Sequence, residues 1–282
     1  MSQHSRRRAL SNLVVSLCGL AVVLALIPLV LIFIYVIKQG FSSLNWDFFT
    51  KMPKPVGESG GGMANAMLGT LWLITIAAFF AIPVGIIAGV YLSEYRGSRF
   101  ASLVRFTADV LNGVPSIVIG IFAYGLAVLP VHRFSALAGG LALGFMMIPI
   151  ITRTTEELLN LVPGTLREGS LALGATRARA AFTVMVPAAL PGIMTGILVA
   201  FARIAGETAP LLFTSFNNRF FSTSLNQPIA SLTVQVFTYA ISPYEDWHRQ
   251  AWAGALVLVA MIFIFSVLAR VVTRRLERMH RT

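Results

Sequence analysis

An arginine and a glutamate lie four residues apart in a strongly apolar stretch. Arg203 and Glu207 belong to the segment 202–210, Ala-Arg-Ile-Ala-Gly-Glu-Thr-Ala-Pro. Residues i and i+4 share a helix face, so these two side chains are expected to neutralise each other. An arginine at the bilayer centre costs roughly 2.5–3.5 kcal/mol on insertion scales and usually faces water or a partner charge. Its planar fork suits an oxyanion, so the pair indicates either an anion path or an ion pair that only fixes helix packing.

A second group of polar side chains lies in another apolar stretch. Asn112 and Ser116 are four residues apart and flank Pro115. On one helix face they can hydrogen-bond a passing anion; alternatively, the proline kinks the helix and they satisfy the backbone groups that it frees. Asp109 is expected near the cytosolic end, where it snorkels or pairs with Arg105. The substrate path predicted from both stretches comprises Asn112, Ser116, Arg203, Glu207 and Thr208.

The polar segment 163–187 has the pattern of two short helices that meet at a glycine. A Pro-Gly pair ends the preceding helix, and Thr165 and Glu168 have the spacing of a capping box. Gly174 can end the first short helix in a left-handed C-cap, and a second short helix is expected over about 175–187. Such an elbow is compact and rigid enough to protrude from a membrane and fit a groove on a partner subunit.

Signatures of catalysis and of metal binding are missing from the sequence. There is no Walker A motif, and all three lysines lie in segments that are expected on the extracytoplasmic side of the membrane. The four histidines are scattered, and Cys18 is the single cysteine, which argues against a metal site and excludes an intrachain disulfide. Asp109 and Glu207 do not form a proton-sharing dyad. We therefore expect no enzyme activity, no metal and no cofactor bound by this chain.

The elements that must position these residues are membrane-spanning helices. The chain is 56% hydrophobic and only 12% charged, and its mean hydropathy is +0.78, which excludes an ordinary soluble domain. A span needs about 20 mostly apolar residues. The expected fold class is an all-α polytopic membrane protein with six transmembrane helices, at about 13–37, 68–92, 106–130, 134–152, 188–213 and 251–269.

The distribution of arginine predicts the orientation of these spans. Fifteen arginines lie in segments that share one face of a six-span topology, whereas the opposite face holds six basic residues. The positive-inside rule therefore places both termini and the elbow in the cytoplasm. The net charge of +11 is explained in this way, and the basic residues form no aromatic-interleaved patch, so no nucleic-acid partner is expected.

The chain divides into three parts by composition. Residues 1–65 hold a basic N-terminus, a first span too long for a cleaved signal, and an outer loop. The glycine-rich run 57–62 in that loop lacks the ending of a P-loop and is interpreted as a linker. Residues 66–272 form the transmembrane body and 273–282 a basic cytoplasmic tail. The segment 229–241 is apolar but too short to cross, so we expect an interfacial or partly re-entrant piece.

The elbow resembles the E-A-A-x3-G-x9-I-x-L-P loop of bacterial ABC importer permeases. Glu168, Gly174 and Pro187 fall at the family spacing, as do Val184 and Val186. Two small residues replace the two alanines, which leaves the elbow intact. The resemblance implies a type I ABC importer (MetI-like) permease fold. It also implies that the elbow docks a cytosolic ATPase through Glu168, Gly169, Ser170, Gly174 and Pro187.

Three further stretches, at 69–95, 111–120 and 202–214, resemble the phosphate-specific ABC importer permeases of the PstA type. The ending Gly-Glu-Thr-Ala-Pro-Leu-Leu-Phe-Thr of the last stretch favours this type over the sister permease. The resemblance implies half of a phosphate path in the bacterial inner membrane and associates the arginine-glutamate pair with that path. The partners that it implies are a PstC-type sister permease, a PstB-type ATPase dimer and a PstS-type extracytoplasmic phosphate-binding protein.

Other function classes stay open at this point. A permease for another oxyanion is not separated from a phosphate permease by physical arguments alone. An autonomous secondary anion transporter or channel needs no docking elbow and often shows inverted hydropathy repeats, which are not seen in this sequence. A membrane enzyme is disfavoured because no nucleophile lies with a base.

Overall fold

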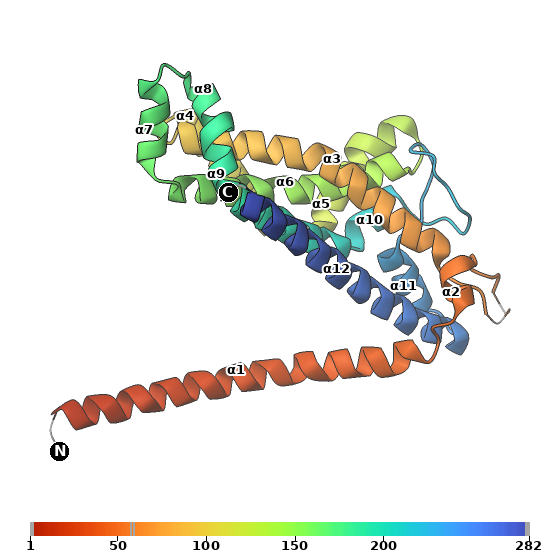
Figure 1. Ribbon diagram of the computed structural model, residues 1–282. Coiled ribbons are helices and arrows are strands. Elements are labelled where there is room, and N and C mark those ends of the chain that lie inside the picture. Colours follow the sequence, from red (N-terminus) through yellow and green to blue (C-terminus); the bar gives the residue numbers. More distant parts are fainter. Residues whose placement is uncertain (1–2, 57, 59, 280–282) are drawn as a thin grey trace.

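The computed structural model describes residues 3–279 apart from residues 57 and 59, and these form helices joined by loops (Figure 1). Within this part of the chain, five helices are long and apolar enough to cross a membrane, and a bent pair of helices brings the number to six. The prediction of an all-α membrane protein is confirmed. The five are α1 (Gln3–Phe41), α3 (Ala64–Glu94), α6 (Ala136–Leu161), the continuous α8–α9 stretch (Arg177–Ala205) and α12 (Glu245–Met279).

Helices α3 and α6 form the centre of the body and pack through glycines. Gly85 and Gly89 of α3, and Gly140 and Gly144 of α6, make two small-xxx-small patterns that let the backbones approach closely. A Cβ added at Gly89 would lie 2.5 Å from Cβ of Thr155. The spacing of these two helices is therefore fixed by backbone-to-side-chain contact over much of their length.

The third predicted span is not one straight helix. Helix α4 (Arg99–Gly113) is bent by 110° from α5 (Ser116–Ala123), which continues through a π-helical turn (Tyr124–Val128) and a 3-10 turn (Leu129–Val131). Val114 and Pro115 between them are extended, with ψ of 132° and 137°. Proline cannot continue the helix, and it drives the preceding residue out of the helical region. The predicted third span, 106–130, is therefore broken at Pro115, as the alternative of a proline kink expects.

The bent pair nevertheless runs from one end of α6 to the other. Arg105 of α4 pairs with Glu156, near the end of α6, and the 3-10 turn ends at Val131, just before α6 begins at Ala136. A 26-residue helix is about 39 Å long, enough to cross the hydrocarbon core. The pair therefore counts as one broken span.

The fifth predicted span is also broken. Helix α9 (Val186–Ala205) ends before residues 206–208, and α10 (Ala209–Thr214) follows. The freed carbonyl of Glu207 accepts a hydrogen bond from Thr233 Oγ1 at 2.9 Å. Helix α5 packs on α10, where a Cβ added at Gly120 would lie 2.6 Å from Cα of Pro210. The expected continuous helix over 188–213 is wrong, and the second halves of the two broken spans lie against each other.

Short elements cover the end of the body opposite the elbow (Figure 1). They include α2 (Trp46–Thr50) and α11 (Leu232–Ala240), and α11 packs on α12, where the rings of Tyr239 and Trp247 stack at 4.5 Å. With nine residues, α11 is too short to cross a bilayer, as expected for 229–241. Its inward face is buried in the protein.

Helix α1 lies apart from the rest of the body (Figure 1). Its apolar span, Leu10–Phe41, has no buried residue in its most hydrophobic window. Near its end it meets α12, where Tyr35 packs edge-on against Trp252 at 5.0 Å. At the other terminus, α12 continues into the segment expected as a basic tail, 273–282, whose last three residues lie outside the described ones.

Candidate substrate path and coupling elbow

The predicted ion pair between Arg203 and Glu207 is not formed. Arg203 lies in the last turn of α9, but the helix ends at Ala205, so Glu207 has left the helical register that would bring the two side chains together. Among the described residues no ion pair or hydrogen bond engages the guanidinium of Arg203, which is exposed. Glu207 and Thr208 are half-buried in the unwound turn. Arg203 is thus free to bind an anion or a group on another subunit.

Asn112 and Ser116 lie on opposite sides of the 110° bend and share no helix face. Asn112 is in the last turn of α4, whereas Ser116 is the first residue of α5. Both are half-buried, and within residues 3–279 neither side chain makes a hydrogen bond to the backbone or to Arg203. The structure brings them near the second break only indirectly, since α5 packs on α10 directly after Thr208.

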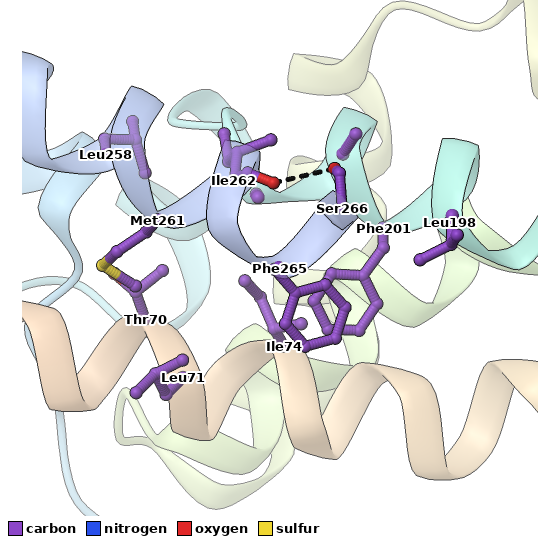
Figure 2. Close-up of a pocket in the computed structure, with 12 residues that line it drawn as sticks. Thr70, Leu71, Ile74, Leu198, Phe201, Leu258, Met261, Ile262, Phe265 and Ser266 are labelled. Carbon is purple, nitrogen blue, oxygen red and sulfur yellow. Dashed lines mark hydrogen bonds between the residues drawn. The ribbon is translucent and has the colours of Figure 1, made fainter. Parts of the chain in front are cut away.

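An apolar pocket lies against the last turns of α9 and is not an anion site (Figure 2). Its volume is about 40 Å³, and it lies between α3, α9 and α12. The rings of Phe201 and Phe265 stack at 4.2 Å along it. Two hydroxyls, of Thr70 and Ser266, line the pocket, and each donates to a carbonyl of its own helix, at 2.8 and 2.7 Å. No free donor is left there for an oxyanion.

A charged cluster that the sequence analysis did not select joins α4 to α6. Glu156 is 3% exposed, and one of its carboxylate oxygens accepts from Arg105 at 2.9 and 2.6 Å, the other from Arg153 at 2.5 Å. Asp109 pairs with Arg153 at 2.9 Å, which corrects its expected pairing with Arg105. In the sequence, the feature that could have revealed this cluster is the three-residue spacing of Arg153 and Glu156 beside an apolar stretch. In the described part of the chain no three metal-ligating side chains come together.

The first arm of the elbow is α7 (Gly164–Ala172), and it ends as the sequence predicts. Gly174 has φ of +85°, its N–H donates to Leu171 O at 2.9 Å, and the next N–H, of Ala175, donates to Ser170 O at 3.2 Å. These two bonds define a Schellman C-cap. The side chain of Leu173, at the tip, is 91% exposed, a feature that the sequence analysis did not identify.

The expected capping box at the start of α7 is wrong. The N-cap is Pro163, no side chain caps the helix, and Thr165 is already inside the first turn. Proline with its fixed φ is compatible with a helix start, so the helix begins two residues earlier than a threonine cap requires. Glu168 and Gly169 are exposed on α7, and Ser170 is half-buried.

The second arm is continuous with the fifth span. Thr176 caps α8 (Arg177–Ala180) by accepting from Arg179 N at 3.3 Å, and a π-helical turn over Ala181–Met185 leads into α9. The wider turn accommodates Pro187, which has no N–H to donate to the preceding turn. The expected second helix is therefore present, but it begins at Arg177 and does not end at Pro187; it continues into α9 as one helical stretch.

Comparison with known proteins shows similarity over nearly the whole chain. Residues 81–278 match the family described as binding-protein-dependent transport system inner membrane component. The Phosphate transport system permease protein PstA of Yersinia pestis is 43% identical over 267 residues, which covers 94% of this chain and 90% of that protein. The Probable phosphate transport system permease protein PstA of Methanocaldococcus jannaschii is 34% identical over 250 residues, 88% of each chain.

Solved structures share the fold at low sequence identity. A bacterial ABC transporter involved in the import of the acidic polysaccharide alginate superimposes with a TM-score of 0.70 at 11% identity, covering 97% of this chain and 99% of that chain. The MetNI methionine ABC transporter, in an inward-facing conformation, gives a TM-score of 0.64 at 20% identity over 76% of this chain and 95% of that chain. These likenesses establish the MetI-like permease architecture.

Proposed function

The chain belongs to the family of binding-protein-dependent transport system inner membrane components and, within it, to the PstA permeases, and on that premise we propose that it imports inorganic phosphate as one subunit of an ATP-driven transporter in the bacterial inner membrane. The observation that carries the substrate class is the 43% identity to a phosphate permease over 94% of the chain. The alternatives, another oxyanion or a secondary transporter, have no comparable support.

The path for phosphate is proposed to run along the two broken spans. Irregular backbone is tolerated at membrane depth where it is buried in protein or lines a water-filled cavity, and broken helices of this kind form binding sites in transporters. Arg203 lies beside one break and has no partner among the residues that the structure describes, and Thr208 lies in the break. Arg203 offers phosphate two parallel N–H donors. Asn112, Ser116 and Glu207 are assigned to the same path, which a PstC-type sister permease completes.

The elbow is proposed to dock a PstB-type ATPase dimer in the cytoplasm. The sequence has no Walker A motif of its own, so ATP hydrolysis is assigned to that partner. The exposed tip at Leu173 and the rigid Schellman cap at Gly174 give a protruding apolar contact of fixed direction. Glu168, Gly169 and Ser170 lie on the same arm. A PstS-type binding protein is proposed to deliver phosphate to the opposite, extracytoplasmic face.

Reconstitution in liposomes tests this function. The chain with its sister permease and ATPase, supplied with binding protein and phosphate outside and ATP inside, should accumulate radiolabelled phosphate, and excess sulfate should not compete. Uptake by the two permeases alone, without the ATPase, would instead identify a secondary transporter. Uptake that sulfate, molybdate or another oxyanion suppresses more strongly than unlabelled phosphate does would assign the permease to that anion.

A further inference from the structure

Helix α7 of the elbow has little to hold it against the body. It contains no buried residue, and its neighbours are mainly α8 and the π-helical turn of its own hairpin. Among the described residues, one side-chain interaction joins α7 to an element outside the elbow. In that interaction Nη2 of Arg167 donates to Oε1 of Glu94 at 2.6 Å, across 73 positions of the sequence.

Glu94 belongs to the rigid centre of the molecule. It is the last residue of α3, and its side chain is only 8% exposed, against 27% for Arg167. Ser93, directly before it, donates to Asn160 Oδ1 of α6 at 3.0 Å and so ties the ends of α3 and α6 together. Because glycines fix these two helices against each other, a force applied at Glu94 acts on both.

The junction around this ion pair has room to move. A polar cleft of about 530 Å³ lies behind the elbow, lined by residues that include Glu94, Arg167 and Met185. Helix α6 connects to α7 only through two extended residues, Val162 and Pro163, with ψ of 131° and 130°. Arg167 binds Glu94 through one nitrogen, and its buried Nε has no partner. The ion pair therefore joins α7 to α3 at a single point, about which the elbow can rotate.

We propose that Glu94 and Arg167 are positioning residues that transmit the movement of the ATPase from the elbow to the α3–α6 pair. The inference rests on the proposed function of the elbow. Its second arm is continuous with α9, so it moves that helix directly. Its first arm has no comparable continuous link to the centre, and the ion pair supplies one. Without the pair, the ATPase would still move α9, and through the close contacts of Gly192 and Gly196 with α6 part of that movement would reach the centre. The end of α3 would have lost its link to the first arm, so less phosphate would be imported for each ATP hydrolysed.

The measurement is the amount of phosphate imported per ATP hydrolysed in the reconstituted complex. We expect Glu94→Gln and Arg167→Gln to lower this ratio at least about fivefold, the size of a weak allosteric coupling, while the ATPase still co-purifies. Arg167→Lys keeps the charge and a single donor, so its ratio should stay within about twofold of the unmodified complex. Asp47→Asn is the matched control, because it removes an ion pair of the same 2.6 Å length on exposed α2.

A covalent link provides the second variant. Glu94→Cys with Arg167→Cys, in a Cys18→Ser background, should be uncoupled as purified and regain the import ratio once a short bifunctional thiol reagent joins the two cysteines. Glutamine variants with an unchanged ratio, a cross-linked variant that stays uncoupled, or loss of the ATPase from the Arg167→Gln complex would each overturn the proposal. If the unmodified complex and Asp47→Asn import no phosphate either, the proposed function itself has failed.

Discussion

Single charged residues in this protein fall into two groups according to whether the chain supplies their partner. Glu156 is buried and accepts hydrogen bonds from two arginines, so its charge is balanced within the fold. Arg203 has no such partner among the described residues, although it lies at the end of an apolar helix. An arginine at membrane depth normally faces water or a partner charge, and the exposed side chain of Arg203 has room for such a partner, which we propose is phosphate.

Replacement of Arg203 by alanine should strongly slow transport without unfolding the protein. Loss of a charge-assisted hydrogen bond to phosphate costs about 1.5–3 kcal/mol, or roughly ten- to a hundredfold in uptake rate. Thermal stability should change by less than about 0.5 kcal/mol, because no internal contact is lost. Arg203→Lys should rescue poorly, since an ammonium has no planar fork. Uptake by proteoliposomes and thermal unfolding of the purified complex are the measurements.

A charge-swapped variant separates this role from helix packing. Arg203→Glu combined with Glu207→Arg should assemble but fail to transport, because the guanidinium then lies at another depth of the path. An assembled swap variant that imports phosphate at the unmodified rate would make Arg203 a structural residue.

Glu156 and its neighbour Glu157 offer a matched pair for the buried cluster. Glu156→Gln keeps the shape of the side chain but leaves two arginines without their shared carboxylate. We expect this change to destabilise the protein by about 2–3 kcal/mol. The loss is smaller than for a fully buried pair because both arginines are over a quarter exposed. Glu157→Gln removes a 65% exposed carboxylate 3.9 Å from Arg153 and should cost less than about 0.5 kcal/mol. Thermal unfolding in detergent compares them, and equal midpoints would contradict the assignment.

At the scale of the helices, two features of the backbone give the elbow its shape. The Schellman cap at Gly174 reverses the chain, and the π-helical turn over Ala181–Met185 makes the second arm part of the fifth span. The second arm and α9 therefore form one continuous helical stretch. The same logic explains the broken spans, in which proline or an unwound turn frees backbone groups that neighbouring helices cover.

Gly174→Val should abolish transport while leaving membrane insertion intact. A β-branched residue in the left-handed region costs roughly 1–2 kcal/mol, which is enough to reorient the two arms and the exposed Leu173. Gly97→Val is the control, because Gly97 has no positive φ and open space around its Cβ position. Co-purification of the ATPase and ATP-driven phosphate uptake should both fall for Gly174→Val alone. If both stay at the level of the control, the docking role of the elbow is wrong.

Across the whole molecule, one end gathers the segments that the charge rule assigns to the cytoplasm. The ion pairs Glu94–Arg167 and Arg105–Glu156 join the ends of α3, α4, α6 and the elbow there. At the opposite end Gln250 donates to Gly60 O, which joins α12 to the outer loop. Figure 1 shows the elbow and the α2–α11 region at these two ends. The expected topology of six crossings with both termini in the cytoplasm is consistent with this arrangement.

Cysteine labelling tests that orientation. In a Cys18→Ser background, a membrane-impermeant maleimide should label Thr223→Cys in intact cells and Gly97→Cys only after the membrane is opened, since both positions are exposed but lie at opposite ends. Labelling of Gly97→Cys from outside intact cells would invert the topology.

The sequence by itself determined the features that depend on local composition and on single special residues. Hydropathy predicted six crossings, arginine bias predicted their orientation, and Gly174 predicted a left-handed cap, which its φ of +85° confirms. The elbow motif and the 202–214 stretch identified the permease class. Each signal is contained within a few neighbouring residues, so it can be read before the chain folds.

Only the tertiary structure decided how the spans break and which charges meet. Apolar residues stay apolar in a helix or in an extended turn, so hydropathy gave no sign that residues 114–115 and 206–208 interrupt two spans, although Pro115 and Pro210 marked the places. The break at 206–208 separates Arg203 from Glu207. The break at 114–115 places Asn112 and Ser116 on two different helices, so they share no helix face. The partners of Arg105 and Arg167 lie 51 and 73 positions away, and contacts at that separation are set by helix packing rather than by local sequence.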